Sequence, residues 1–296
     1  MPIQIRRTAI LDNPPVGLVP GQLAVEMAND PPRLWVGVPA LVDAAERREV
    51  GGTNLLPPAL MGAQANLRGI RISPTVYSFS VSNLIVRDAD ARGLTVEGTT
   101  SLCDLNVIGE NGRDQAVPFT SVLWIQFYWI YNDMTKVLAT IASEALPAGG
   151  GPTLPPGFTH SCYIGPIRWT DGPDGLIPVI IRGRRFFYPS SYIRGIIASA
   201  VASFTEVTVS TAALVPENAD EMVLFITVTG FASWGHFHVR LEPTVTTLLI
   251  IAAGLQQYSN GQVVFPNINQ RIFCMTDGNA FGWIYVTAYT ISNGAI

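Results

Sequence analysis

The sequence predicts a mainly β protein, and three observations support that fold class. Runs of about five to nine residues rich in Thr, Val, Ile and aromatic side chains recur between Gly, Pro, Asn and Asp residues, which is typical of strands and turns. Helix-like spacing is confined to two short stretches, 40–48 and 192–203. A Leu-x-Val repeat recurs every ten or eleven residues between positions 84 and 109. We therefore expect an N-terminal hairpin segment (1–66), a short β-helical or β-prism shaft (67–118) and a C-terminal, jelly-roll-like β-sandwich head (119–296).

The composition suggests that other protein covers much of the surface. Charged residues make up 14% of the chain and hydrophobic residues 48%, whereas ordinary soluble domains have about 25% charged residues. An oligomer would explain both values. The net charge of −4 is spread without a basic run, so nucleic acid is not an expected partner. The longest apolar stretch, 247–254, is too short for a membrane span, and no membrane insertion is expected.

The N-terminal residues and the cysteines point to assembly in the cytoplasm. Asp12, Asn13 and two prolines follow Arg6 and Arg7, where an export signal would need an apolar region. The three cysteines are widely spaced and form no Cys-x-x-Cys pair, so neither a disulfide framework nor a zinc site is predicted. We expect small buried hydrophobic residues at Cys103, Cys162 and Cys274.

Residues 1–66 contain one compact motif. The residues at 20–26 and 33–36 form two short strand signals, joined by a turn at 29–32. A lone hairpin of this size buries too little apolar area to offset its chain entropy. The segment therefore needs a partner surface.

This motif resembles the Gly-Glu-Leu-Ala-[Val/Ile]-Asn-x-Ala-Asp-x-[Lys/Arg]-Leu-[Tyr/Phe] stretch near the N-termini of phage tail and head fibre proteins. Gln22 replaces the Glu, Glu26 replaces the Asn, and the Pro31-Pro32 pair lengthens the turn. The resemblance implies a virion anchor formed by Gly21, Leu23, Ala24, Val25, Arg33, Leu34 and Trp35. The alternative is an ordinary hairpin without an attachment role.

The repeat in 67–118 predicts strands that cannot bury their apolar stripe alone. In each unit the Leu and Val share one face and a Gly or Asp makes the turn. The apolar positions are Leu84, Val86, Leu94, Val96, Leu105 and Val107. Phage fibre shafts with similar repeats wind three chains about one axis, so the resemblance implies a homotrimer. The alternative is an ordinary meander in a globular domain.

The segment 119–296 predicts a sandwich of many strands. The stretch 122–131 is hydrophobic on both faces, which is typical of a central strand. A hairpin-type turn is expected at Asn260-Gly261. The other expected strands are 179–188 with a break at 182–183, 207–211, 222–229, 235–241, 245–252, 262–265, 272–275 and 282–291.

The last of these strands places four aromatic residues on one face. They are Phe281, Trp283, Tyr285 and Tyr289. Aromatic faces stack on sugars and also fill protein interfaces. We expect most of these residues to pack in the core or against another subunit, because the low charge already implies buried interfaces.

Residues suited to catalysis are sparse. The chain has three histidines and contains no Gly-x-Ser-x-Gly, His-Glu-x-x-His or P-loop motif. His236 and His238 should share one strand face with Arg240, and a threefold arrangement of such pairs could hold a metal ion, but a solvated polar stripe is the favoured interpretation. Loop acids could supply a glycosidase pair, yet such acids are usually only solvated: Asp171, Asp174, Glu217, Asp220 and Glu221. We expect no enzyme activity, no cofactor and no metal.

The combined expectation is a structural protein of a tailed phage virion. It would be a trimeric fibre assembled in the host cytoplasm, attached to other virion proteins by its N-terminus, with an outward head for adhesion to a host-surface glycan or protein. Two alternatives remain: a capsid decoration or head fibre protein without receptor binding, and a glycan-cleaving tail spike.

Overall fold

The computed structural model describes residues 5–8, 23–26, 33–37, 47–49, 64–90, 93–189, 206–230, 235–241, 249–253, 258–276 and 280–291. Within these ranges the regular structure consists of strands and one short 3-10 turn, Pro147–Gly149, without an α-helix. The mainly β prediction is therefore confirmed. The chain divides into two compact units, one of Met1–Met61 with Arg87–Leu94, the other of Gly62–Val86 with Thr95–Ile296.

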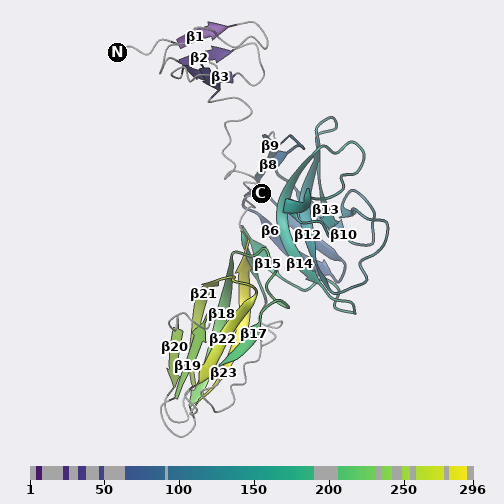
Figure 1. The fold of residues 1–296 in the computed structure, drawn as a ribbon. Coiled ribbons are helices and arrows are strands. Elements are labelled where there is room, and N and C mark those ends of the chain that lie inside the picture. Colours follow the sequence, from purple (N-terminus) through teal and green to yellow (C-terminus); the bar gives the residue numbers. More distant parts are fainter. Residues whose placement is uncertain are drawn as a thin grey trace. The chain divides into compact units, whose positions relative to one another are not determined.

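The first unit contains a four-stranded sheet in the order β1-β2-β3-β4, drawn in purple to dark blue in Figure 1. Its strands are β1 (Ile5–Thr8), β2 (Leu23–Glu26), β3 (Arg33–Gly37) and β4 (Arg47–Glu49). The expected hairpin is present, since β2 and β3 pair antiparallel from Leu23 opposite Val36 to Glu26 opposite Arg33. Strands β1 and β4 flank it on either side.

The two expected helices have different outcomes. Arg47 and Arg48, at the end of the stretch 40–48, belong to strand β4. Pairing with Gly37 and Val36 of β3 extends these residues, so sheet formation overrides the local helical spacing. The remainder of that stretch, and all of 192–203, lie outside the described residues.

The described strands of the second unit form three sheets. The eight-stranded sheet has the order β10-β7-β6-β15-β16-β23-β18-β21, the seven-stranded sheet β11-β13-β12-β14-β8-β5 with β9 beside β8, and the four-stranded sheet β17-β22-β19-β20. The strands up to β13 are β5 (Gln64–Ala65), β6 (Arg68–Ser73), β7 (Val76–Ser80), β8 (Asn83–Arg87), β9 (Gly93–Glu97), β10 (Thr100–Asp104), β11 (Gly112–Arg113), β12 (Leu123–Asn132) and β13 (Val137–Ser143). The later strands are β14 (His160–Trp169), β15 (Ile180–Arg182), β16 (Arg185–Phe187), β17 (Val207–Ser210), β18 (Glu221–Gly230), β19 (Gly235–Arg240), β20 (Leu249–Ala253), β21 (Tyr258–Pro266), β22 (Arg271–Thr276) and β23 (Ala280–Thr290).

Aromatic rings join the eight-stranded sheet to the seven-stranded sheet. Phe79 of β7 lies with its ring centroid 5.2 Å from that of Phe127 of β12, and Tyr77 lies 6.1 Å from the same ring. All three side chains are almost fully buried. These two sheets therefore pack face to face as a sandwich.

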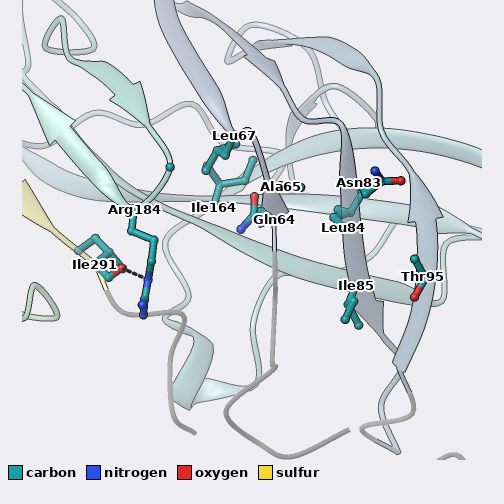
Figure 2. A pocket seen from close by; sticks show the side chains of 11 residues that line it. Gln64, Ala65, Leu67, Asn83, Leu84, Ile85, Thr95, Ile164, Arg184 and Ile291 are labelled. Carbon is teal, nitrogen blue, oxygen red and sulfur yellow. Dashed lines mark hydrogen bonds between the residues drawn. The ribbon is translucent and has the colours of Figure 1, made fainter.

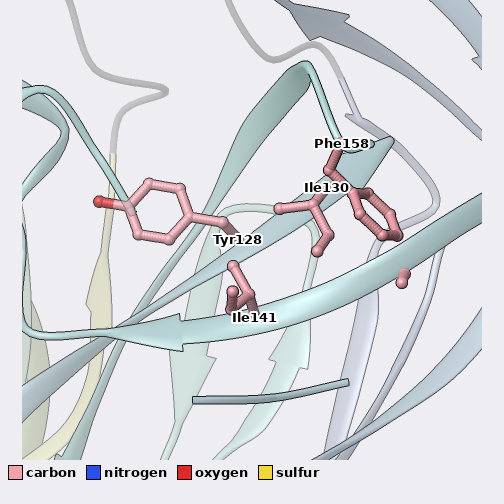
Figure 3. Close-up of a cluster of buried hydrophobic side chains, with 5 residues drawn as sticks. Tyr128, Ile130, Ile141 and Phe158 are labelled. Carbon is pink, nitrogen blue, oxygen red and sulfur yellow. The ribbon is translucent and has the colours of Figure 1, made fainter. Parts of the chain in front are cut away.

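Strand β12 is buried on both faces, as expected for the stretch 122–131. Its second face contributes Tyr128 and Ile130 to a cluster with Ala139, Ile141 and Phe158 (Figure 3). Phe158 belongs to the segment between β13 and β14, and it closes the cluster from the loop side. The continuous apolar run is thus explained by burial against a sheet on one side and a loop on the other.

The far end of the eight-stranded sheet packs against the four-stranded sheet. The ring of Phe237 on β19 lies so close to Gly282 of β23 that a Cβ on this glycine would be 2.4 Å from the ring. Tyr289 of β23 donates its hydroxyl to the Pro166 carbonyl oxygen of β14 at 2.7 Å. The eight-stranded sheet therefore packs against the seven-stranded sheet and against the four-stranded sheet, and β23 contributes to both interfaces.

The compact units do not follow the three expected modules. Strands β6, β7 and β10, from the expected shaft, share the eight-stranded sheet with β15 to β23 of the expected head. The boundary at 118 separates strands that hydrogen-bond to one another, for example Gly69 opposite Ile181. Gln64 and Ala65 belong to the second unit, because they pair with Leu84 and Asn83 of β8.

The repeat is also organised differently from a three-chain shaft. Its residues Leu84, Val86, Val96 and Leu105 are buried inside this single chain, while Leu94 is half-buried. The third repeat is a turn rather than a strand, and its Val107 is 45% exposed. The interior of this single chain therefore supplies the apolar surroundings that the alternation requires.

One turn prediction was wrong. Asn260 and Gly261 lie inside β21, opposite Thr227 and Ile226 of β18. The ladder with β18 continues through both positions, so pairing with a long neighbouring strand overrides the local turn signal.

Candidate functional site

The outer face of the eight-stranded sheet exposes a row of aliphatic side chains. Cross-strand register places Leu102 of β10 opposite Ser78 of β7, and Ser78 opposite Ile70 of β6. Ile180 of β15 comes next to Ile70, since Ile181 pairs with Gly69. The exposed fractions are 53% for Leu102, 53% for Ile70 and 36% for Ile180. We call this the aliphatic row.

A second row on the same face consists of polar and cationic side chains. Ser80 of β7 lies opposite Arg68 of β6, Arg68 opposite Arg182 of β15, and Arg182 opposite Arg185 of β16. All three arginines are exposed. We call Arg68, Arg182 and Arg185 the arginine row.

The strand period explains why these residues face outward. In β6, Arg68 and Ile70 are exposed, whereas Gly69 is buried and lies against Ile181. A Cβ on Gly69 would be 2.6 Å from the Ile181 side chain, so the inner side of β6 is closely packed. Alternation then directs the next residues outward. None of these outward residues was among the predicted site residues. The alternation of residues 68–72 indicates which side chains share a face, but not which strand lies beside β6.

The predicted anchor residues lie on adjacent strands of the first unit. Leu23, Ala24 and Val25 belong to β2, and Arg33, Leu34 and Trp35 to β3. Their backbones pair, with Ala24 opposite Trp35 and Val25 opposite Leu34. Gly21 lies outside the described residues. The pairing brings the two halves of the motif together.

The two histidines of β19 have the expected orientation. The rings of His236 and His238 have centroids 6.3 Å apart, while Phe237 and Val239 between and after them are fully buried. Arg240 follows on the same side, with its Nη1 3.6 Å from Glu206 Oε2. The described residues contain no group of three His, Cys, Asp or Glu side chains arranged to hold a metal ion.

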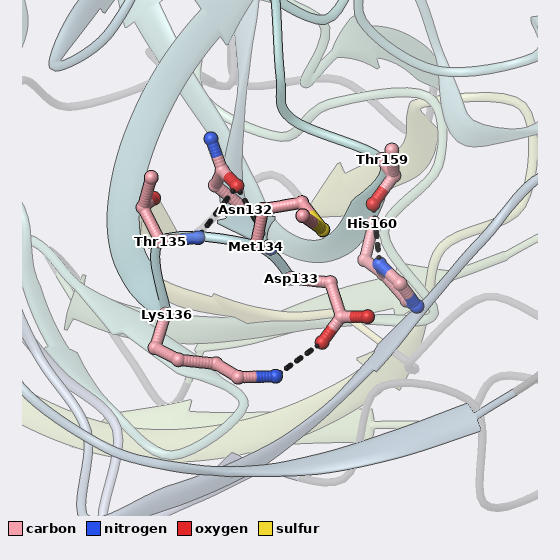
Figure 4. A network of polar contacts seen from close by, with 7 residues as sticks. All are labelled: Asn132, Asp133, Met134, Thr135, Lys136, Thr159 and His160. Carbon is pink, nitrogen blue, oxygen red and sulfur yellow. Dashed lines mark hydrogen bonds and ion pairs between the residues drawn. The ribbon is translucent and has the colours of Figure 1, made fainter.

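A polar turn joins β12 to β13 (Figure 4). The Asn132 Oδ1 accepts hydrogen bonds from the backbone N–H groups of Met134 and Thr135 at 3.0 and 3.1 Å. Lys136 Nζ donates to Asp133 Oδ1 at 2.7 Å, and this bond lowers the pKa of the Asp133 carboxyl. These contacts fix the turn, and the charged groups of Asp133 and Lys136 pair with each other.

The predicted loop acids lie in two separate connections. Asp171 and Asp174 belong to the loop between β14 and β15, and Glu217 and Asp220 to the connection before β18, which begins at Glu221. Asp171 and Glu217 are exposed. The Asp174 carbonyl accepts a hydrogen bond from Arg71 Nη2 at 2.6 Å, which fastens the first loop to β6.

A cavity of about 470 Å³ opens beside β5 and β8 (Figure 2). Its lining is mostly apolar, with Leu67, Leu84, Ile164 and Ile291 among the lining residues. The side-chain amide of Gln64, which lines the cavity, already makes two hydrogen bonds within the protein. Its Nε2 donates to the Tyr163 carbonyl at 2.6 Å, and its Oε1 accepts from Trp129 Nε1 at 3.1 Å. Arg184 Nε likewise donates to the Ile291 carbonyl. The cavity therefore offers shape, but few uncommitted polar groups for a ligand.

Across the described ranges, no helix is long and apolar enough to span a membrane.

Comparisons with known proteins found no matching family model and no matching curated protein. Among solved structures, the chain has a TM-score of 0.19 and 8% identity to "Structure of infectious bursal disease virus Gx strain", covering 79% of this chain and 70% of that one. It has a TM-score of 0.18 and 6% identity to a Bacillus thuringiensis Cry1Da tryptic core variant, covering 78% and 52%. Scores this low do not establish a shared fold.

Proposed function

We propose that this chain is a non-enzymatic structural subunit of a tailed phage virion, a tail or head fibre whose first unit attaches it to the particle and whose second unit adheres to the host surface. The observation behind the adhesion role is the outer face of the eight-stranded sheet, where the aliphatic row and the arginine row lie side by side. Exposed apolar residues gathered on one face are typical of interaction surfaces. The attachment role is supported by the motif residues on β2 and β3.

The attachment role can be tested by deleting residues 1–61, which ends at the boundary between the two compact units. A deletion to residue 66 would also remove Gln64, whose side chain bonds to Trp129 and Tyr163 in the second unit. We expect the shortened chain to fold but to be absent from particles, as measured by immunoblotting of purified virions. Electron microscopy of intact virions with a labelled antibody should place the full chain on the particle. Incorporation at normal copy number without residues 1–61 would contradict the anchor.

The trimeric state is part of the proposal. Its support is the low charged content of 14% together with exposed aliphatic side chains outside the aliphatic row, such as Ile108, Val117 and Val122, since a subunit interface would cover such a surface. Sedimentation equilibrium of the full chain should give one species of three copies. A stable monomer at micromolar concentration would exclude the trimer.

The absence of hydrolase activity is also proposed. A glycosidase needs two carboxyl groups held roughly 5–10 Å apart in a cleft, whereas Asp171 and Glu217 are exposed on separate connections. Incubation with host-surface polysaccharide should release no reducing ends. Release that disappears in Asp171→Ala or Glu217→Ala would instead establish a glycan-cleaving spike.

A further inference from the structure

The arginine row is unusual because its three like charges are direct cross-strand neighbours. Arg68 pairs with Arg182, and Arg182 pairs with Arg185. Directly opposed residues on neighbouring strands have Cβ atoms only about 4.5–5.5 Å apart, and like charges in such pairs destabilise a sheet. The fold therefore tolerates a local repulsion at the surface.

No carboxylate of the described residues pairs with these arginines. The ion pairs that the structure describes lie elsewhere, at Lys136 with Asp133 and at Arg240 with Glu206. Along the same row, Arg185 is followed by Thr290 and then by Glu221. Two strand spacings separate Arg185 from Glu221, which amounts to roughly 10 Å and is close to the screening length at physiological salt. The repulsion would be relieved by an external anion.

Three open grooves meet at Arg68. Their volumes are about 310, 390 and 430 Å³. Arg182 lines two of them, Ser80 also lines two, and Ile70 lines one. Guanidinium groups, hydroxyl groups and an aliphatic side chain therefore border the same continuous surface.

These three kinds of group match an acidic sugar chain. A sugar ring presents hydroxyl groups for hydrogen bonds, C–H faces for aliphatic contact, and in acidic sugars a carboxylate or phosphate that arginine can bind in a bidentate manner. Single-stranded nucleic acid would instead require aromatic side chains on which its bases stack. The exposed neighbours of the arginine row are aliphatic, as Ile70 and Ile180 show. The aromatic side chain beside them, Phe187 opposite Ile180, is half-buried. The Arg185 guanidinium already lies over its ring, 5.9 Å from the centroid, so this ring offers little free face for a base.

We propose that the arginine row and its adjoining grooves bind an acidic polysaccharide through its carboxylate or phosphate groups. The inference rests on the adhesion role proposed above and gives that role a ligand class and a place on the sheet. Arg68 and Arg182 are the central contacts, and Ser80 and Ile70 contact the sugar rings beside them.

The test compares two double variants of the full chain that lose the same charge. Arg68→Gln with Arg182→Gln removes the centre of the row. Lys136→Gln with Arg271→Gln removes two exposed cations elsewhere, one in the β12–β13 turn and one on β22. Binding is measured by titration calorimetry with polygalacturonate as the carboxylate probe, a phosphomannan as the phosphate probe, dextran as the neutral control and a single-stranded oligonucleotide.

We expect wild type to bind at least one acidic polymer, with affinity that falls as ionic strength rises. The Arg68→Gln/Arg182→Gln variant should bind at least about tenfold more weakly, and the Lys136→Gln/Arg271→Gln variant within about twofold of wild type. Circular dichroism and thermal melting should show that both variants are folded. The proposal is overturned by equal binding of both variants, by binding of dextran as strong as that of the acidic polymers, by failure of wild type to bind either, or by preference for the oligonucleotide.

Failure of this site and failure of the proposed function can be told apart. Virions containing the Arg68→Gln/Arg182→Gln variant should incorporate it at normal copy number but attach less well to host cells. In one outcome, polymer binding depends on the arginine row but antibody labelling does not find the chain on virions. This outcome would retain the site and reject the phage role. Virion localisation with unchanged polymer binding in this variant would reject the site alone.

Discussion

The phenol of Tyr163 connects three segments of the second unit. Its hydroxyl donates to Gln126 Oε1 of β12 at 2.7 Å and accepts from Asn218 Nδ2 of the connection before β18, also at 2.7 Å. Burial raises the pKa of Tyr163 well above its usual value, because a buried phenolate would lose its hydration. The group therefore stays protonated at neutral pH and can donate its hydrogen bond.

Replacing Tyr163 with Phe should destabilise the second unit. The change leaves the Gln126 oxygen and the Asn218 amide without this partner in a partly buried site, which costs about 1–3 kcal/mol in the free energy of unfolding. Urea denaturation measures the loss. Tyr285→Phe is the control, since Tyr285 is half-buried and its hydroxyl makes no hydrogen bond within the described residues; its effect should be within about 0.5 kcal/mol. Similar losses in both variants would contradict a structural role for the Tyr163 hydroxyl.

The buried thiols predict a loss of stability at alkaline pH. Burial raises the pKa of Cys103 and of Cys274 to about 12, whereas an unfolded thiol ionises near 8.5–9. Between these values the unfolded chain binds fewer protons than the folded chain, so the free energy of unfolding falls as pH rises. The contribution of each thiol to the free energy of unfolding is fully present below about pH 9 and is lost as pH rises toward about 12.

Cys103→Ala tests whether the buried thiol causes stability to fall as pH rises. The cavity left by the substitution lowers stability at every pH, but the variant lacks one titrating thiol. Its curve of unfolding free energy against pH should therefore be shallower than that of wild type by about 1.4 kcal/mol per pH unit between roughly pH 9 and 12. Urea denaturation at several pH values in this range, with reductant present, gives both curves. Parallel curves would mean that the thiol is not protected from ionisation.

At the scale of single strands, a bulge shapes the pairing of β12 with β14. Phe127 lies opposite Gly165 and Tyr128 opposite Tyr163, so Ile164 has no direct partner across the pair. Gly165 has a φ of +146°, and a Cβ at this position would be 2.2 Å from the Phe186 ring. The bulge thus brings the backbone of β14 close to β16, where only glycine fits.

Gly165→Ala is expected to destabilise the protein by about 2–5 kcal/mol, from backbone strain and forced movement of the Phe186 ring. Gly172→Ala is the matched control, because a Cβ there has no neighbour within 4 Å. Its effect should lie between no change and a gain of about 1 kcal/mol, since alanine restricts the unfolded chain. Thermal melting of both variants measures the difference. A Gly165→Ala protein as stable as wild type would show that the sheets can separate at little cost.

Bulges also mark where sequence periodicity stops predicting side-chain direction. Alternation places Tyr289 on the same face of the last strand as Trp283 and Tyr285. In the structure, Ala288 lies opposite Val223 but Val286 opposite Leu224, so Thr287 is an extra residue in β23. Tyr289 consequently turns to the inner face and is 0% exposed, while Trp283 and Tyr285 are half-buried. The alternation of polar and apolar residues in the sequence gives no sign of this extra residue.

For the whole molecule, the sequence predicted strands much better than their partners. The run 122–131 and the break at 182–183 correspond closely to β12 and to the turn between β15 and β16. The pairing of β6 with β15 joins residues more than a hundred positions apart, and no local pattern specifies such a contact. The candidate site was missed for the same reason, since Arg68, Arg182 and Arg185 form a row only after that pairing.

The shared eight-stranded sheet predicts that the second unit folds as one piece. A fragment of residues 62–296 retains all three of its sheets, whereas a fragment of residues 119–296 loses β6, β7 and β10 from one sheet and β5, β8, β9 and β11 from the other. The shorter fragment would expose the inner face of β12, including Phe127 and Trp129, which are fully buried in the chain.

The burial energy that the shorter fragment loses is large enough to prevent it from folding. Phe79, Leu84 and Val86 are each no more than 1% exposed, and burying three such side chains contributes about 5–9 kcal/mol. That is comparable with the whole stability of a typical domain, about 5–15 kcal/mol. We expect 62–296 to be soluble, with near-ultraviolet circular dichroism and a single cooperative unfolding transition, and 119–296 to aggregate or to be digested rapidly by protease. A folded, protease-resistant 119–296 fragment would show that the head is an autonomous module and that the pairing of β6 with β15 is dispensable.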